Sequence, residues 1–396
     1  MKKIYTLLAG LTLGCLSQIN GQILTREDSL SAGLIRSNAV TVLSGYGNVR
    51  YSNNLTDKSA SANVDRIVLF VGHKFTKKLS FFSELELEDC KIAGGELGGE
   101  FAMEQAFLKF DINASNYITT GLFIPRVGII NENHLPTTFN GNDRPFVENF
   151  VIPATWREIG IGYYGISNRI PGLNYSLALM NGLNSAGFEK GTGFRGGRFE
   201  GREANANALA VNGALLYYFK NLRFQISGYY GGSSGISKLA ADTLLLKNKP
   251  FSTPVQLIES NIQYHTHGFT LKALAAFVSI PKAFDINQAY NNNTANAILG
   301  FYGEVGYNFL HKTDKNLTLF GRYEGMNMNL KLPTNALRDE TINRQYLVTG
   351  ITFQPHKGVA VKLDYYCLLT GAATSTIAKP IFDKQNVLNL GVAYSF

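Results

Sequence analysis

The chain has 396 residues, of which 17% are charged, and it carries a formal net charge of +8. Its mean hydropathy is −0.03, and no apolar run after the N-terminus approaches the ~18 residues of a membrane-spanning helix, so helical spans are excluded. The charge is spread over both signs, which does not favour nucleic-acid binding.

Residues 1–21 are typical of a secretory signal peptide. Lys2 and Lys3 precede an apolar stretch over residues 4–16, and cleavage after residue 21 would lower the formal charge to +6. We expect residues 22–38 to form a short periplasmic segment.

The cysteines indicate neither a disulfide framework nor a metal site. Cys15 leaves open a lipoprotein leader, although Thr12 stands where such leaders carry leucine. Cys90 and Cys367 lie in separate strand-like segments far apart in sequence, and we interpret them as isolated apolar side chains.

Residues 39–396 are predicted to be an all-β domain, a transmembrane antiparallel up-and-down barrel of about sixteen strands. Alternating apolar and polar residues predict these strands: 39–52, 64–75, 79–90, 100–112, 116–125, 156–168, 172–182, 205–219, 221–232, 254–266, 268–279, 295–310, 316–328, 344–354, 358–370 and 386–396. Their connections alternate between short turns and long loops, which is typical of outer-membrane barrels with the turns in the periplasm.

One parity of these strands is apolar and the other carries charge. In 359–366, for example, Val361 and Leu363 oppose Lys362 and Asp364. We predict that the charged parity faces a wet lumen, since unpaired buried charges would be too costly. The lumen-lining candidates are Arg66, Glu84, Glu86, Arg223, Glu259, Lys272, Glu304, Arg322, Glu324, Lys362 and Asp364. Aromatic residues beside the short turns predict a girdle at the periplasmic interface: Phe75, Phe110, Tyr164, Tyr217, Phe219, Tyr264, Phe309, Phe353 and Phe396.

The longest connection, residues 126–155, is rich in apolar residues such as Ile129, Phe139 and Val151. A solvated loop has little use for them, so we expect this third long loop to fold inward and narrow the pore. The candidate constriction residues are Arg126, Glu132, His134, Asp143, Arg144, Glu148, Arg157 and Glu158. His134 is interpreted as a hydrogen-bonding residue rather than a metal ligand.

The fourth long loop carries a basic cluster of Lys190, Arg195, Arg198 and Arg202. Arginine is suited to phosphate or carboxylate groups, but interspersed glutamates nearly cancel the charge. A salt-bridged loop or a lipopolysaccharide contact is the favoured interpretation over an anion-recruiting site.

Four stretches resemble the outer-membrane porins of Bacteroidetes-type bacteria, which are often grouped with the phosphate-selective porin family: 121–125, 131–134, 152–162 and 193–207. The resemblance implies a sixteen-stranded, trimeric, passive channel. Phosphate selectivity in that family rests on an arginine ladder and a lysine cluster, whereas the inward positions here are mixed in sign. A weakly selective porin is therefore expected, with at most a mild anion preference.

We predict a non-enzymatic outer-membrane porin of a Gram-negative bacterium, which passes small hydrophilic solutes or ions. No catalytic, cofactor-binding or metal-binding residues are assigned. The expected partners are membrane lipid, lipopolysaccharide, two identical subunits, and the insertion machinery acting on the aromatic end at Phe396. The alternative is a structural or binding barrel with a closed lumen and partner-binding extracellular loops.

Overall fold

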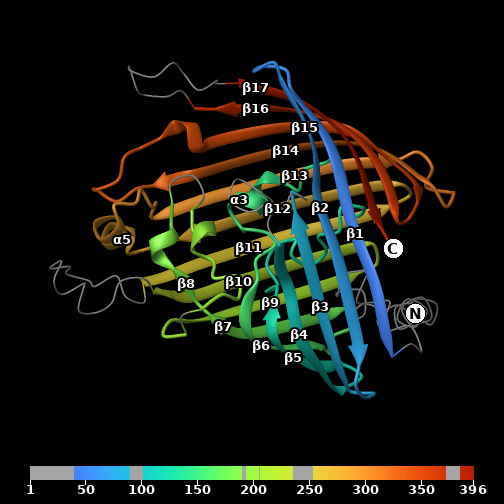
Figure 1. The fold of residues 1–396 in the computed structure, drawn as a ribbon, viewed down its shortest axis with the longest axis horizontal. Coiled ribbons are helices and arrows are strands. Elements are labelled where there is room, and N and C mark those ends of the chain that lie inside the picture. The colour runs from blue at the N-terminus through green and yellow to red at the C-terminus, as the bar shows by residue number, and fades with distance from the viewer. Residues whose placement is uncertain (1–39, 90–100, 190–192, 205, 235–252, 372–383) are drawn as a thin grey trace, which may run out of the picture.

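The computed structural model describes residues 40–89, 101–189, 193–204, 206–234, 253–371 and 384–396, which form one closed antiparallel barrel (Figure 1). The predicted signal peptide 1–21 and periplasmic segment 22–38 lie outside the described residues, as do Cys90 and Lys190.

The chain order of the strands matches the prediction. They are β1 (Thr41–Asn54), β2 (Ser59–Lys74), β3 (Leu79–Glu88), β4 (Phe101–Asn113), β5 (Asn116–Phe123), β6 (Glu158–Ile166), β7 (Leu173–Asn181), β8 (Leu183–Asn184), β9 (Leu209–Phe219), β10 (Leu222–Ser234), β11 (Thr253–Thr266), β12 (Phe269–Ser279), β13 (Ala297–Asn308), β14 (Asn316–Lys331), β15 (Asn343–His356), β16 (Val359–Thr370) and β17 (Lys384–Ser395). Because β8 is only a two-residue piece that pairs in parallel with the end of β10, the barrel proper has the sixteen strands predicted.

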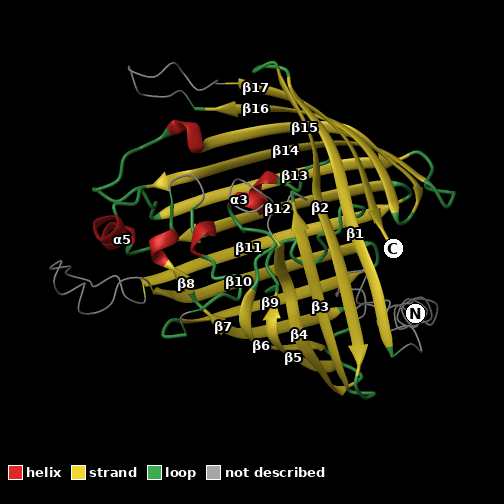
Figure 2. Ribbon diagram, in the orientation of Figure 1, coloured by secondary structure: helices red, strands yellow, loops and turns green. Residues whose placement is uncertain are grey.

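Helices are few and short, as Figure 2 shows. They are α3 (Phe146–Phe150), α5 (Ala283–Tyr290), η2 (Ser185–Gly187), η3 (Arg195–Gly197) and η4 (Glu340–Ile342). Among the described residues, no helix has the length and apolar character needed to cross a membrane.

The barrel closes where the last strand meets the first. Strands β1 and β17 are antiparallel neighbours, with Tyr46 opposite Ser395. The N–H of Phe396 donates to the carbonyl of Gly45 at 2.9 Å, and the N–H of Gly45 donates back at 3.1 Å. The C-terminal strand therefore removes the open edge that an unfinished sheet would expose.

Side chains alternate between an apolar outer surface and a polar interior. On β14, Leu319 and Tyr323 are 48% and 45% exposed, whereas Arg322 and Glu324 between and beside them are 2% and 0% exposed. A soluble sandwich would place its apolar face inside, so this arrangement is that of a barrel surrounded by lipid.

The two ends of the barrel differ. The C-terminus and hairpin turns such as that between β11 and β12 lie at one end, the turn end, and α5 lies at the opposite end, the loop end, together with the β1–β2 connection (Figure 1). At the turn end, the β11–β12 hairpin is closed by His267 and Gly268, whose φ angles of 43° and 86° fit a two-residue turn with positive φ at both positions.

Two sequence predictions about the ends are wrong. The β1–β2 connection is a four-residue turn, 55–58, rather than a long loop, because both strands extend further and Ser52 pairs with Ser61. Tyr164 is 2% exposed and does not belong to an outer aromatic girdle. It stacks on Tyr117 inside the barrel, with ring centroids 5.0 Å apart, because its position in β6 has the inward parity.

Candidate functional site: a loop inside the barrel

Residues 124–157, between β5 and β6, form the inner loop, which lies against the inward faces of the barrel strands. Val147, Val151 and Trp156 are each 0% exposed and belong to one apolar cluster with Leu257 and Phe320 of the barrel wall. The apolar content of this loop is therefore used to pack on the wall.

A glycine of the wall allows the short helix α3 to approach closely. A Cβ atom on Gly300 of β13 would lie 2.7 Å from Val151 Cγ2 and 2.9 Å from Val147 Cγ1. Carbon atoms at such distances overlap, so α3 can pack this closely on β13 only if the residue at this position is glycine.

Glu148 holds α3 and the start of the loop together. Its Oε2 atom accepts the N–H groups of Ile129 and Ile130, both at 2.7 Å, and its Oε1 atom accepts the hydroxyl of Tyr302 at 2.6 Å. Burial raises the pKa of Glu148 to about 7, although these hydrogen bonds oppose the shift.

The tip of the loop is bonded to β16. Lys362 Nζ donates to the carbonyls of Phe139 at 2.8 Å and Gly141 at 2.7 Å. The N–H of Asn142 donates to Asp364 Oδ2 at 2.8 Å. Two predicted lumen residues are thus occupied in holding the loop.

Strands β13 and β14 contribute a buried charge network beneath the loop. Arg322 lies 3.1 Å from Glu304 and 2.8 Å from Glu324, and Lys272 lies 3.8 Å from Glu304. Asn140 of the loop donates to Glu304 at 3.0 Å. Glu304, Arg322 and Glu324, which were predicted to line the lumen, are buried and are covered by protein rather than by lumen water.

The base of the loop is held by a further charged group. Arg126 Nε lies 2.7 Å from Glu132 Oε1, and Arg223 of β10 lies 3.6 Å from Glu132 Oε2. Glu259 of β11 is 1% exposed and accepts the N–H of Gly128 at 3.2 Å. Arg223 and Glu259 of the wall therefore attach the base of the inner loop to β10 and β11.

Asp143 lies across the seam where the barrel closes. Its Oδ1 atom accepts from Arg50 of β1, and its Oδ2 atom accepts from Asn389 of β17 at 3.5 Å. One loop carboxylate therefore contacts both the first and the last strand.

Glu158 does not line an opening. It is 0% exposed and accepts the indole N–H of Trp156 at 2.9 Å and the amide of Asn181. Glu158 is the first residue of β6, and its side chain packs between the barrel wall and the inner loop.

A cavity of about 410 Å³ lies at the loop end of the inner loop. Six arginines border it: Arg50, Arg66, Arg144, Arg157, Arg195 and Arg198. Six carboxylates also border it: Asp65, Glu86, Glu88, Asp89, Asp143 and Glu200. We call this space the loop-end cavity, and its lining is strongly polar but balanced in sign.

The predicted basic cluster is divided by the fold. Arg198 and Arg157 share Glu200, at 2.7 and 3.1 Å, whereas Arg195 donates to the carbonyl of Asn149 at 2.7 Å. Burial and the neighbouring Arg198 lower the pKa of Arg195 to about 10. Arg202 is exposed and does not border the loop-end cavity, and Lys190 lies outside the described residues.

A second cavity, of about 460 Å³, lies at the turn end, and we call it the turn-end cavity. Its charged lining consists of Lys220, Arg223 and Lys272 against Glu132. Phe139 borders both cavities, so the tip of the inner loop separates them.

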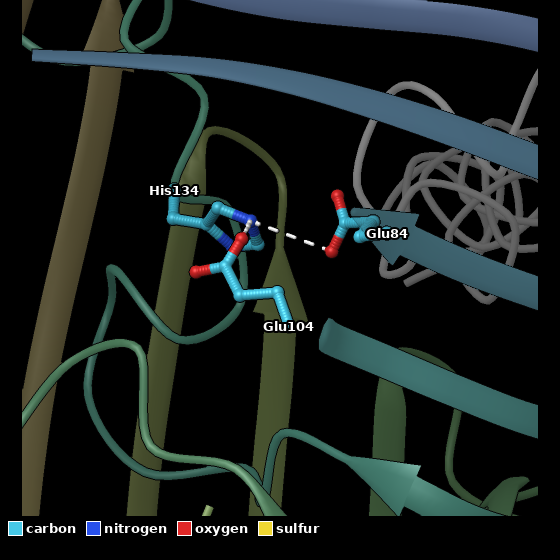
Figure 3. A group of neighbouring side chains, drawn as sticks. All are labelled: Glu84, Glu104 and His134. Carbon is cyan, nitrogen blue, oxygen red and sulfur yellow. Dashed lines mark ion pairs between the residues drawn. The ribbon is translucent and has the colours of Figure 1, made fainter. Parts of the chain in front are cut away.

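His134 meets two glutamates of the barrel wall (Figure 3). Its Nε2 atom lies 3.6 Å from Glu104 Oε2 and 3.7 Å from Glu84 Oε2, and the three residues are 2%, 0% and 0% exposed. Burial would lower the pKa of His134, but the carboxylates of Glu104 and Glu84 outweigh it and raise the pKa to about 9. The role of His134 as a hydrogen-bonding residue stays a prediction, and the contacts that the structure gives its Nε2 atom are the two ion pairs with Glu104 and Glu84.

Sequence reasoning missed Glu104. The β3–β4 register shifts between Glu84 and Leu85, which pair with Gln105 and Met103, so a bulge turns Glu104 inward. The available signal was the adjacent polar pair Glu104 and Gln105, which interrupts the alternation of the strand.

Comparison with known proteins agrees with the fold. No family model matches the chain. An uncharacterized protein of Aquifex aeolicus is 30% identical over 338 residues, which is 82% of this chain and 74% of the relative. The chain belongs to the family of this Aquifex protein.

Solved porins share the barrel. OmpF of Salmonella typhi, in a complex with daunomycin, has a TM-score of 0.55 at 13% identity, covering 90% of this chain and 97% of that one. An anion-selective porin of Comamonas acidovorans has a TM-score of 0.53 at 12% identity, covering 90% of this chain and 99% of that one. The outer-membrane channel DcaP of Acinetobacter baumannii has a TM-score of 0.53 at 11% identity, covering 90% of this chain and 97% of that one. At these identities the likeness shows the fold, which is that of outer-membrane porins.

Proposed function

We propose that the protein is an outer-membrane channel of a Gram-negative bacterium, through which small hydrophilic solutes or ions diffuse. The observation that carries the proposal is the pair of cavities that reach the inner loop from opposite ends, both with charged residues in their linings and with Phe139 as a shared border. Selectivity would arise at this loop from its width and its local charges. A passive channel of this kind would catalyse no reaction and need no cofactor.

A mild anion preference is part of the proposal. The turn-end cavity has three basic residues against one acidic residue in its lining. At the loop end, Arg157 and Arg198 share the single carboxylate of Glu200, and Arg195 borders the same cavity. The balanced remainder of the lining supports weak preference rather than a dedicated phosphate filter.

The setting of the channel is likewise proposed. The outward apolar positions suit lipid, and the loop end would meet lipopolysaccharide. A signal peptide over 1–21, a periplasmic segment over 22–38, insertion guided by Phe396, and a homotrimer complete the proposal. Membership of the phosphate-selective group of Bacteroidetes-type porins rests on the sequence resemblance.

A closed-lumen barrel that binds a partner through its loops is the second candidate. The burial of Glu259, Glu304 and Glu324 beneath the inner loop favours it, because these inward side chains do not contact open water.

Conductance in planar bilayers separates the two candidates. Stepwise single-channel openings by the purified, folded protein are expected for a channel, and a barrel that stays silent in repeated insertions would favour the closed-lumen candidate. Reversal potentials in a salt gradient then measure ion preference. A potential of the sign expected for cations would refute the anion preference while leaving the channel intact.

A further inference from the structure

The group of Glu84, Glu104 and His134 has no role in the proposed passage of solutes. Within the described part of the chain, it is the one cluster of three histidine or carboxylate side chains whose ligand atoms all lie within 4.8 Å of one another. All three are buried, and they belong to β3, the bulge of β4 and the inner loop. Figure 3 shows the three side chains next to one another.

Four polar atoms of this group lack the hydrogen-bond partners that burial normally requires. Glu84 Oε1, Glu104 Oε1 and both ring nitrogens of His134 have no hydrogen-bond partner among the described residues. Buried polar atoms of native proteins are nearly always satisfied, and an ion is one of the few groups that can satisfy several at once.

The distances fit coordination better than a direct ion pair. A charge-assisted hydrogen bond between an imidazolium and a carboxylate is about 2.7–2.9 Å long. Two ligand atoms bound at about 2.1 Å to one tetrahedral metal ion lie about 3.4 Å apart. The separations of 3.6 and 3.7 Å from His134 Nε2 to the two carboxylates are close to the second value.

Neighbouring side chains would support the ligands. Gln105 Nε2 donates to Glu84 Oε2, and the hydroxyl of Tyr46 donates to Glu104 Oε2 at 3.1 Å. Hydrogen bonds of this kind orient metal-binding carboxylates. His134 also borders the loop-end cavity, which gives an ion and a water ligand a route to the site.

We propose that Glu84, Glu104 and His134 bind a divalent transition cation of the zinc type, through one nitrogen and two oxygen ligands, with a further position open to the loop-end cavity. One imidazole and two carboxylates form a donor set suited to zinc. A bound ion would join the inner loop to β3 and β4, on the side of the loop away from the α3 contact with β13 and β14.

Zinc titration of the chelator-treated, folded barrel in detergent, followed by calorimetry, tests this proposal. One zinc ion should bind per chain. Glu84→Gln, Glu104→Gln and His134→Gln should each weaken binding by more than the roughly 10- to 100-fold expected from losing a supporting hydrogen bond. Gln105→Ala should weaken it by about that smaller factor. Glu88→Gln, on the same strand and 46% exposed in its side chain, is the matched control and should bind as the wild type does.

A second measurement does not depend on the folding of variants. X-ray absorption at the zinc edge of the wild-type complex should show one imidazole nitrogen together with oxygen ligands and no sulfur. Absence of stoichiometric zinc binding by the wild type would mean that the group is a plain ion pair, and would overturn the proposal. Unchanged affinity in a folded His134→Gln protein, or a spectrum without imidazole, would overturn it equally.

Discussion

Enlarging Gly300 should loosen the inner loop from the barrel wall. In Gly300→Ala the new Cβ would lie 2.7 Å from Val151 Cγ2 and 2.9 Å from Val147 Cγ1. Carbon atoms in contact are about 3.5–4.0 Å apart, so the two methyl groups must retreat by about 0.6–1.3 Å. Both valines are fully buried, and a close-packed interior leaves little room for such a shift.

Overpacking of this kind costs about 1–3 kcal/mol. Because the strain is relieved when α3 leaves the wall, the undocked fraction of the loop should rise by about 5- to 150-fold. Chymotrypsin reports this fraction directly, since cleavage after Phe139, which is 8% exposed, requires the tip of the loop to leave the barrel. Single-channel recordings should show more frequent visits to a larger conductance.

Gly303→Ala is the matched control. It lies on the same strand, and a Cβ there meets nothing within 4 Å. The control should behave as the wild type in both assays, with folding verified by the heat-dependent mobility of the barrel on gels. Equal cleavage and conductance in the two variants would refute the inference that α3 rests directly on Gly300.

Three further changes probe the same loop. Glu148 has a pKa of about 7 in the folded chain against an ordinary 4.5, so the docked loop retains the proton that the undocked loop loses. The contribution of Glu148 to docking should therefore be full below pH 4.5 and fall by about 3 kcal/mol as the pH rises from 4.5 through 7. Chymotrypsin cleavage, divided at each pH by the rate on a small peptide substrate, should rise more steeply over this range in the wild type than in Glu148→Gln. A wild-type profile that parallels the glutamine variant would contradict this. Deletion of residues 130–150 should raise conductance and relax size exclusion in liposome swelling, since the loop tip separates the two cavities. Unchanged conductance would mean that solutes do not pass the loop. Arg195→Gln should shift the reversal potential toward cations, whereas Arg202→Gln, at an exposed position outside the cavity lining, should not. An equal shift in both would assign ion preference to the overall charge of the loops.

The strands were predictable because each carries its own signal. Alternation within β14 or β16 reports two faces, and the turn residues His267 and Gly268 mark where the chain reverses. Such signals are local, so they do not depend on knowing the partner strand. The β1–β2 turn was missed because the small residues of Ser59–Ala62 have weak strand propensity, and their pairing with β1 makes them a strand.

The interior was less predictable because its contacts are distant in sequence. Lys362 has the alternation of a lumen residue, yet it binds the carbonyl of Phe139, 223 positions earlier. A mid-strand charge is compatible with lumen water or with a covering loop, and no local pattern separates the two. Glu104 illustrates a second limit. Inward and outward positions were predicted from strict alternation along each strand, and the bulge in β4 interrupts this alternation at Glu104.

The position of Asp143 has a consequence for assembly. A barrel made from one chain could close with its first and last strands in a shifted register, because the backbone hydrogen bonds alone can form in several registers. Asp143 touches Arg50 on one edge and Asn389 on the other, so both of its contacts exist in a single alignment of the edges. The loop that narrows the passage would thereby also stabilise the native register of β1 and β17 relative to barrels closed in a shifted register.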